Sequence, residues 1–288
     1  MEQLSTDFET STDSTRRTFL AGAAASGLGL SAVGLFTQPV AAKNHRAGKS
    51  HRTGKNRRLI LRGDAAAAAN ARPTTDEHNT IRGSWAVAGD GDGDGLDDKL
   101  FFWLAPETLP FGFDSFTVSD LVGVSYYTKT DHATGGTTPQ NISLSIYTQP
   151  DGADDDASWY GYRLDAEPYF ARALDAPPNQ WNEWSTADGS NQLTFYDSNR
   201  TGVGFGFYGG QPTLRDLRAG PVNWANLKDG AEDRTIDYGA ETVEAIVFTT
   251  GSGWTDDFEG YLDTIELRLA KGPGRSKKGQ TLRIDLEP

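Results

Sequence analysis

The sequence predicts an all-β protein, a sandwich of two antiparallel sheets. Its 33 Gly, 13 Pro and 11% aromatic residues suit many short strands joined by turns. Apolar side chains at Ile142, Leu144 and Ile146 alternate with their neighbours, which is the period of a strand with one buried face. A chain of 288 residues has room for one large β domain.

The expected strands are short apolar runs bounded by turn residues, and the ordered domain is expected to span residues 80–288. Helical signal is limited to short pieces such as Thr213–Arg218, and Leu282, Ile284 and Leu286 alternate as a final edge strand would. The other strand candidates are Leu100–Leu104, Val122–Thr128, Ile142–Thr148, Tyr160–Leu164, Val203–Tyr208, Val243–Thr249 and Tyr261–Leu269.

Residues 1–42 have the pattern of an export leader. Arg16 and Arg17 precede Phe19-Leu20 and a mildly apolar stretch, and Val40-Ala41-Ala42 offers small residues for signal peptidase. This arrangement resembles the twin-arginine signal, which implies the twin-arginine translocase as a partner and an extracellular or cell-surface location. The apolar stretch is too short and too weakly hydrophobic for a convincing membrane span, although an uncleaved N-terminal anchor is the alternative.

Residues 43–79 are expected to form a disordered spacer. The segment is basic, then alanine-rich through Ala65–Ala69, and it lacks a sustained apolar face. A solvated tail is the simplest interpretation of its charge, with docking on acidic envelope polymers as the alternative.

The charge changes sign after the spacer. From Pro73 onward, 35 Asp and Glu stand against 16 Lys and Arg, which makes nucleic acid a poor partner. Abundant Asp with scarce Lys resembles proteins of salt-loving archaea, in which concentrated salt screens carboxylate repulsion; an acidic mesophilic protein is the alternative. The absence of cysteine excludes disulfides and thiolate sites.

The region from about Phe116 to Leu269 resembles a jelly-roll module of secreted microbial proteins, related to galactose-binding-like and laminin-G-like sandwiches. Asp120–Tyr126 and Trp181–Trp184 resemble two of its strands, and Phe258–Asp263 is similar to its closing strand. Thr264 departs from the Asn or Asp usual at that point. The resemblance implies a fold, with glycan binding or a structural role as its usual functions.

A calcium loop is predicted at Asp90, Asp92, Asp94 and Asp98. Carboxylates at alternate positions can converge on one hard cation, and Gly95 permits the tight turn. The pattern resembles the calcium loops of dockerin and thrombospondin-like repeats. It departs from an EF-hand because Phe101 stands where a bidentate Glu belongs, so further oxygens must come from elsewhere. An acidic halophilic loop without a specific ion is the alternative.

Large aromatic residues make extracellular polysaccharide a candidate ligand, because sugar C–H faces complement a π surface. The ligand-binding candidates are Trp159, Tyr160, Trp181 and Trp184. Core packing is the competing role for each of them.

No catalytic residues are assigned. Glu167 and Glu183 are the most plausible carboxylate pair for a jelly-roll glycoside hydrolase or polysaccharide lyase, which is the alternative function. A structural role in the cell envelope is the third function considered. Asp263 shares strand parity with Tyr261 and Ile265, so it should point inward and cap backbone groups if that parity holds.

Overall fold

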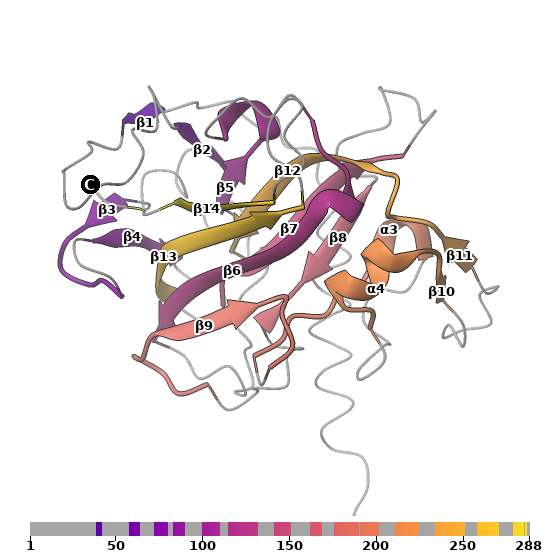
Figure 1. Ribbon diagram of the computed structural model, residues 1–288. Helices are drawn as coiled ribbons and strands as arrows, with labels where there is room; N and C mark the ends of the chain where they lie inside the picture. Colours follow the sequence, from indigo (N-terminus) through magenta and orange to yellow (C-terminus); the bar gives the residue numbers. More distant parts are fainter. Residues whose placement is uncertain are drawn as a thin grey trace, which may run out of the picture.

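A computed structural model describes the chain over most of the predicted domain and three short segments before it. The described residues are 39–41, 58–63, 72–79, 83–89, 100–109, 115–131, 141–150, 162–168, 176–189, 191–201, 211–224, 234–250, 258–270, 279–284 and 286. Figure 1 shows two sheets packed face to face, with short helices at one end. The all-β prediction is confirmed.

Two six-stranded antiparallel sheets, A and B, form the body of the protein. Sheet A has the order β1 (Pro39–Ala41), β2 (Arg58–Gly63), β5 (Leu100–Leu104), β12 (Thr242–Thr249), β7 (Ser143–Gln149) and β8 (Arg163–Ala166). Sheet B has the order β3 (Arg72–Thr74), β4 (Ser84–Gly89), β13 (Phe258–Leu269), β6 (Leu121–Thr130) and β9 (Asn182–Ser185), and β14 (Gln280–Ile284) also pairs with β13.

The central strands have the connectivity of a jelly roll. The chain passes from β4 in sheet B to β5 in sheet A, and then to β6, β7, β8, β9, β12 and β13. The resulting orders, β4-β13-β6-β9 and β5-β12-β7-β8, interleave early and late strands as two Greek keys do. The jelly-roll prediction is therefore confirmed.

Short helices and a hairpin cover one end of the sandwich. They are η2 (Pro106–Thr108), η3 (Val118–Asp120), α3 (Ser198–Thr201), α4 (Leu214–Ala219) and the hairpin of β10 (Val222–Trp224) with β11 (Arg234–Ile236). A capping box between Thr213 and Asp216 begins α4, which agrees with the predicted helix. No helix in the described ranges is long and apolar enough to cross a membrane.

Alternating side chains from both sheets fill one core. The Trp85 and Phe102 rings meet edge to face at 5.7 Å, and Tyr126 and Phe248 meet at 4.8 Å, so each aromatic pair joins sheet B to sheet A. Leu144 and Ile146 of β7 point into this core and are fully buried, as predicted, but Ser145, Tyr147 and Thr148 between and after them are buried as well, so the expectation of a single buried face for this strand was wrong. Burial of this kind stabilises the fold by about 25 cal/mol per Å² of apolar surface.

A β-bulge changes the parity of β13. Asp263 pairs with Tyr127 and Glu266 pairs with Ser125, so β13 carries one more residue than β6 in this interval. Thr264, inside the bulge, has a φ of 42°, in the left-handed region. Leu262 is buried before the bulge and Ile265 after it, so the assumption of one parity along the whole strand was wrong.

The ordered domain starts before Thr80. β3 pairs with β4, and residues 75–79, here called the strap, continue over sheet B. Ser84 Oγ donates to the Glu77 carbonyl at 2.6 Å, which fixes the strap to β4. Residues 72–79 therefore belong to the sandwich, as does β2, which pairs with β5; both segments lie within the predicted spacer. β3 lacks apolar alternation because it is a short edge strand held by its backbone.

Candidate binding face on sheet B

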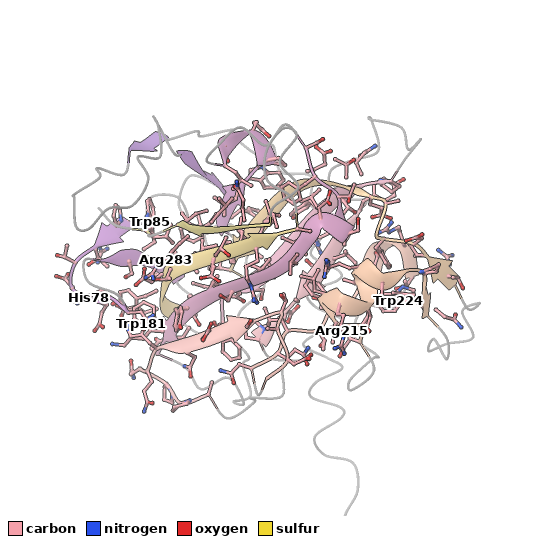
Figure 2. The ribbon with its side chains drawn as sticks, viewed as in Figure 1. His78, Trp85, Trp181, Arg215, Trp224 and Arg283 are labelled. Atoms are coloured by element: carbon pink, nitrogen blue, oxygen red, sulfur yellow. The ribbon has the colours of Figure 1, made fainter. Side chains whose placement is uncertain are left out.

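The outer face of sheet B combines aromatic and charged side chains. We call it the sheet-B face; its residues are Arg72, Tyr127, Lys129, Trp181, Glu183, Glu259, Tyr261, Glu266, Arg268 and Arg283. They lie on this face because their neighbours Tyr126, Leu262 and Trp184 point into the core. Trp181 and Arg283 are labelled on sheet B in Figure 2.

One cross-strand row places a cation on each side of a tyrosine. Arg72 pairs with Ala86, Ala86 pairs with Tyr261, and Tyr261 pairs with Lys129. Trp181, immediately before β9, reaches the same place: its ring centroid lies 6.5 Å from that of Tyr261, with the planes tilted by 56°. Both aromatic side chains are partly exposed.

Charged neighbours hold the Tyr261 ring. Lys129 Nζ lies 6.0 Å from the ring centroid and forms an ion pair with Glu77 of the strap at 2.7 Å. The Tyr261 hydroxyl donates to Glu259. Burial raises the pKa of Tyr261 to about 12, and the hydrogen bond and charge of Glu259 add to this effect. Tyr261 therefore stays protonated at neutral pH and keeps its donor directed at Glu259.

A second row lies beside the first. Asp263 pairs with Tyr127, and Tyr127 pairs with Glu183 of β9. Burial raises the pKa of Tyr127, as do its hydrogen bond to Glu183 and the charge of that carboxylate. Asp263 is fully buried beneath the strap and accepts hydrogen bonds from the backbone N–H groups of Asn79 and Thr264. These contacts bear out a backbone-capping role for Asp263, but its side chain lies on the outer side of sheet B and not in the core, so the expected inward direction was wrong.

The predicted ligand-binding residues separate into three cases. Trp181 lies on the sheet-B face, next to Tyr261. Trp184 is fully buried, and its indole N–H donates to Thr128 Oγ1 at 2.7 Å, so its assignment as a ligand-binding residue was wrong. Alternation along β9 directs its ring inward. Trp159 and Tyr160 lie outside the described residues.

The predicted metal and export residues also lie outside the described ranges. These are Asp90, Asp92, Asp94 and Asp98 for calcium, and Arg16 and Arg17 for export. Within the described part of the chain, no group of three or more His, Asp and Glu side chains could hold a metal ion.

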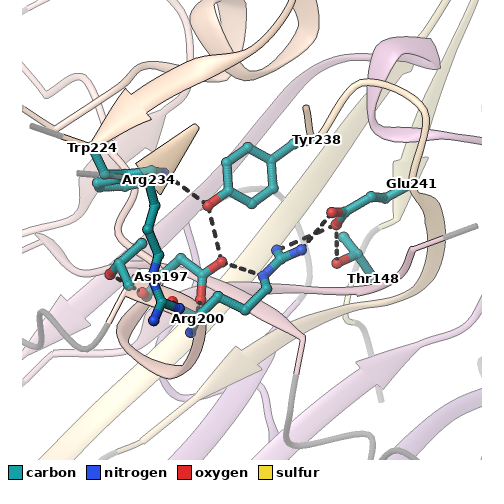
Figure 3. A network of polar contacts seen from close by, with 8 residues as sticks. Thr148, Asp197, Arg200, Trp224, Arg234, Tyr238 and Glu241 are labelled. Atoms are coloured by element: carbon teal, nitrogen blue, oxygen red, sulfur yellow. Dashed lines mark hydrogen bonds and ion pairs between the residues drawn. The ribbon is translucent and has the colours of Figure 1, made fainter. Parts of the chain in front are cut away.

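A polar network at the helical end was not found by sequence reasoning (Figure 3). The Arg200 guanidinium lies between Asp197 and Glu241, with N···O distances of 2.5 Å to each. The carboxylates are 0% and 5% exposed, so one cation neutralises two almost buried anions. Tyr238 and Tyr162 flank the guanidinium, with its carbon 4.6 and 5.3 Å from their ring centroids.

Internal donors satisfy both carboxylates of this network. Tyr238 donates to Asp197 at 2.9 Å, and Thr148 Oγ1 donates to Glu241 at 2.6 Å. Burial, followed by the charge of Asp197, raises the pKa of Tyr238. The contacts of Asp197 and Glu241 therefore have a structural explanation, because a buried carboxylate needs a cation and hydrogen-bond donors as partners.

The carboxylate pair considered for hydrolysis is not brought together. Glu183 lies on β9 of sheet B and is exposed, whereas Glu167 follows β8 of sheet A and accepts a hydrogen bond from Tyr196. A glycosidase needs its two carboxyl groups on either side of one bond. Glu167 and Glu183 lie on different sheets, and each has its own partner. The structure therefore does not support them as a catalytic pair.

A comparison of the sequence with protein-family models gives no match, and a search of curated proteins gives none either. The candidate site therefore depends on its own geometry. Its central feature is the partly exposed Trp181–Tyr261 pair, bordered by hydrogen-bonding and charged groups.

Proposed function

We propose that the protein is an exported, non-catalytic jelly-roll protein that binds polysaccharide through the sheet-B face. The observation that carries this proposal is the Trp181–Tyr261 pair, with ring centroids 6.5 Å apart on the outside of the sandwich. Large aromatic residues usually serve the core, so two on an outer face suggest a ligand.

The surrounding groups suit a sugar. Glu259 offers carboxylate oxygen to sugar hydroxyls, and the Glu77–Lys129 pair offers both an acceptor and a donor close to the ring of Tyr261. Aromatic faces with a few polar groups at their edge provide affinity and orientation, respectively.

The test measures binding of the purified protein to a panel of soluble polysaccharides by affinity electrophoresis. Trp181→Ala and Tyr261→Ala should each weaken binding about tenfold, which corresponds to about 1.4 kcal/mol. Val122→Ala is a matched control, because Val122 is 40% exposed on β6 but seven residues from Lys129, about 23 Å along the strand. Unchanged binding by both aromatic variants would refute the proposal.

Calcium binding by Asp90, Asp92, Asp94 and Asp98 is proposed as a stabilising element. The strands on either side of this loop support the proposal. Gly89 pairs with Phe258, and Leu100 N–H donates to Thr250 Oγ1 at 2.8 Å. Residues 90–99 connect β4 to β5, and residues 251–257 connect β12 to β13. Because β4 is next to β13 and β5 is next to β12, the two segments begin and end on neighbouring strands.

The sequence of the second segment offers the oxygens that the first one lacks. Asp256 and Asp257 lie in it, and the position of the usual bidentate Glu is occupied by Phe101, which is buried in β5. We therefore propose that Asp256 or Asp257 completes the calcium shell.

Export is proposed to use the twin-arginine translocase and to deliver a folded domain to the cell surface or medium. The support is Arg16-Arg17 ahead of Phe19-Leu20, together with a chain that has no cysteine to oxidise after export. An acidic surface adapted to concentrated salt is part of the same proposal.

A further inference from the structure

Building on the proposed function, we infer that the polysaccharide bound by the sheet-B face is acidic and presents uronic acid carboxylates to Arg72 and Lys129. These two cations lie in one cross-strand row, on either side of Tyr261. Adjacent strands are about 4.8 Å apart, so three strand spacings separate the cations by about 14 Å. A chain of sugars crossing the strands would meet both of them.

The charge of the surrounding protein makes this row unusual. From Pro73 onward the chain has 35 acidic and 16 basic residues, whereas the sheet-B face has four cations, Arg72, Lys129, Arg268 and Arg283, against three carboxylates, Glu183, Glu259 and Glu266. Arg72 is exposed, and no described carboxylate lies within ion-pair distance of it. An exposed guanidinium is a bidentate donor that matches a carboxylate.

Lys129 already binds a carboxylate from the protein itself. Glu77 Oε2 lies 2.7 Å from its Nζ, and the two side chains are 36% and 16% exposed, respectively. Glu77 belongs to the strap, so this carboxylate is supplied from above the sheet by a separate segment. We regard Glu77 as an internal substitute for the ligand's carboxylate, which a uronic acid displaces when it binds.

The aromatic pair gives this site its preference for sugar over other polyanions. Trp181 and Tyr261 stack against sugar rings, while Arg72 and Lys129 form ion pairs with the uronic acid carboxylates. A flexible polyanion without rings would use only the cations, and it would lose most of its affinity with added salt.

The experiment compares polygalacturonate with the same polymer after methyl esterification, at one ionic strength. The wild type should bind the acid form at least about tenfold more tightly, which corresponds to about 1.4 kcal/mol. Arg72→Gln and Lys129→Gln should weaken binding of the acid form severalfold and leave binding of the ester unchanged. Glu77→Gln should strengthen binding of the acid form, a gain that a folding defect cannot mimic. Arg215→Gln is the control, because Arg215 is an exposed cation on α4, at the other end of the sandwich.

The outcomes separate this inference from the proposed function. Equal affinity for the acid and the ester, both lost in Trp181→Ala, would overturn the inference and leave polysaccharide binding intact. Equal affinity for polygalacturonate and polyglutamate would also overturn it, because charge alone would then suffice. If the wild type binds neither polymer, the inference is overturned. The proposed function would fall only if Trp181→Ala and Tyr261→Ala also left binding to every other polysaccharide unchanged.

Discussion

The carboxylate of Asp263 accepts a hydrogen bond from the backbone N–H of Asn79, at 3.0 Å and across 184 residues of sequence. Its other oxygen accepts the N–H of Thr264 at 2.6 Å, inside the bulge of β13. One buried side chain thus joins the strap to the strand that runs through the centre of sheet B. Because Glu77 of the same strap pairs with Lys129, this connection also positions one side of the proposed binding face.

Asp263→Ala should destabilise the protein by about 2–4 kcal/mol, because the N–H groups of Asn79 and Thr264 lose their acceptors. The free energy of unfolding from urea denaturation measures this loss. Asp188→Ala is the control: its ion pair with Arg215 spans 3.4 Å between side chains that are 73% and 72% exposed. That variant should change stability by no more than about 0.5 kcal/mol. Similar losses in both variants would contradict the buried-acceptor role.

Arg200→Met should destabilise the protein by about 3–5 kcal/mol, because it leaves Asp197 and Glu241 buried without their cation. The same urea experiment measures the effect. Adding Asp197→Asn and Glu241→Gln to Arg200→Met should recover part of the loss, since the unpaired charges are then removed. No recovery in the triple variant would show that Arg200 acts through packing against Tyr162 and Tyr238 instead.

Local sequence patterns predicted β5, β7 and β12 because the signals of these strands lie within single segments; β2, β3 and β4 were not predicted, and the candidate strand Val203–Tyr208 lies outside the described residues. β5 was predicted with its observed bounds, and β7 and β12 to within one residue at either end, since apolar runs and turn residues suffice there. The inward direction of Trp184 depends instead on the register of β9 against β6. The bulge at Thr264 adds one residue to β13, and no local pattern in the sequence indicated where.

The candidate site was predictable only in part, for a related reason. Trp181 was found because aromatic residues are few enough to be considered individually. Its partners Tyr261, Lys129 and Arg72 come from strands far apart in the sequence, so only the sheet order brings them together. Likewise, the Arg200 network collects groups from four separate segments, two of them without regular structure, where spacing in sequence predicts nothing.

Stability should decline as pH rises from about 10 to about 12, and Tyr261 should contribute to this decline. An unfolded tyrosine titrates near pH 10, whereas the folded protein raises the pKa of Tyr261 to about 12. In that interval the unfolded state has released a proton that the folded state retains, so unfolding becomes more favourable. Urea midpoints across the interval should fall less steeply in Tyr261→Phe than in the wild type. Parallel curves would show that the Tyr261 hydroxyl is not held as described.

Calcium should raise the thermal unfolding midpoint in concentrated salt, because an ion that binds only the native state stabilises it. Addition of a chelator should lower the midpoint of the wild type and leave Asp90→Asn/Asp94→Asn unaffected. Asp256→Asn/Asp257→Asn should reduce the calcium response, if one of these residues completes the shell. Asp154→Asn/Asp155→Asn, in the acidic run Asp151-Gly152-Ala153-Asp154-Asp155-Asp156, is the control. A wild-type midpoint that does not respond to chelator would refute calcium binding.

Export should depend on the two arginines of the leader. Arg16→Lys/Arg17→Lys keeps the charge and removes the guanidinium groups, so a block in this variant reports on recognition of the pair and not on net charge. Pulse labelling with fractionation should then find the protein in the cytoplasm, as a folded and protease-resistant domain. Arg57→Lys/Arg58→Lys makes the same exchange in the basic segment and should be exported normally. If the leader variant reaches the medium at the wild-type rate, the twin-arginine route is wrong.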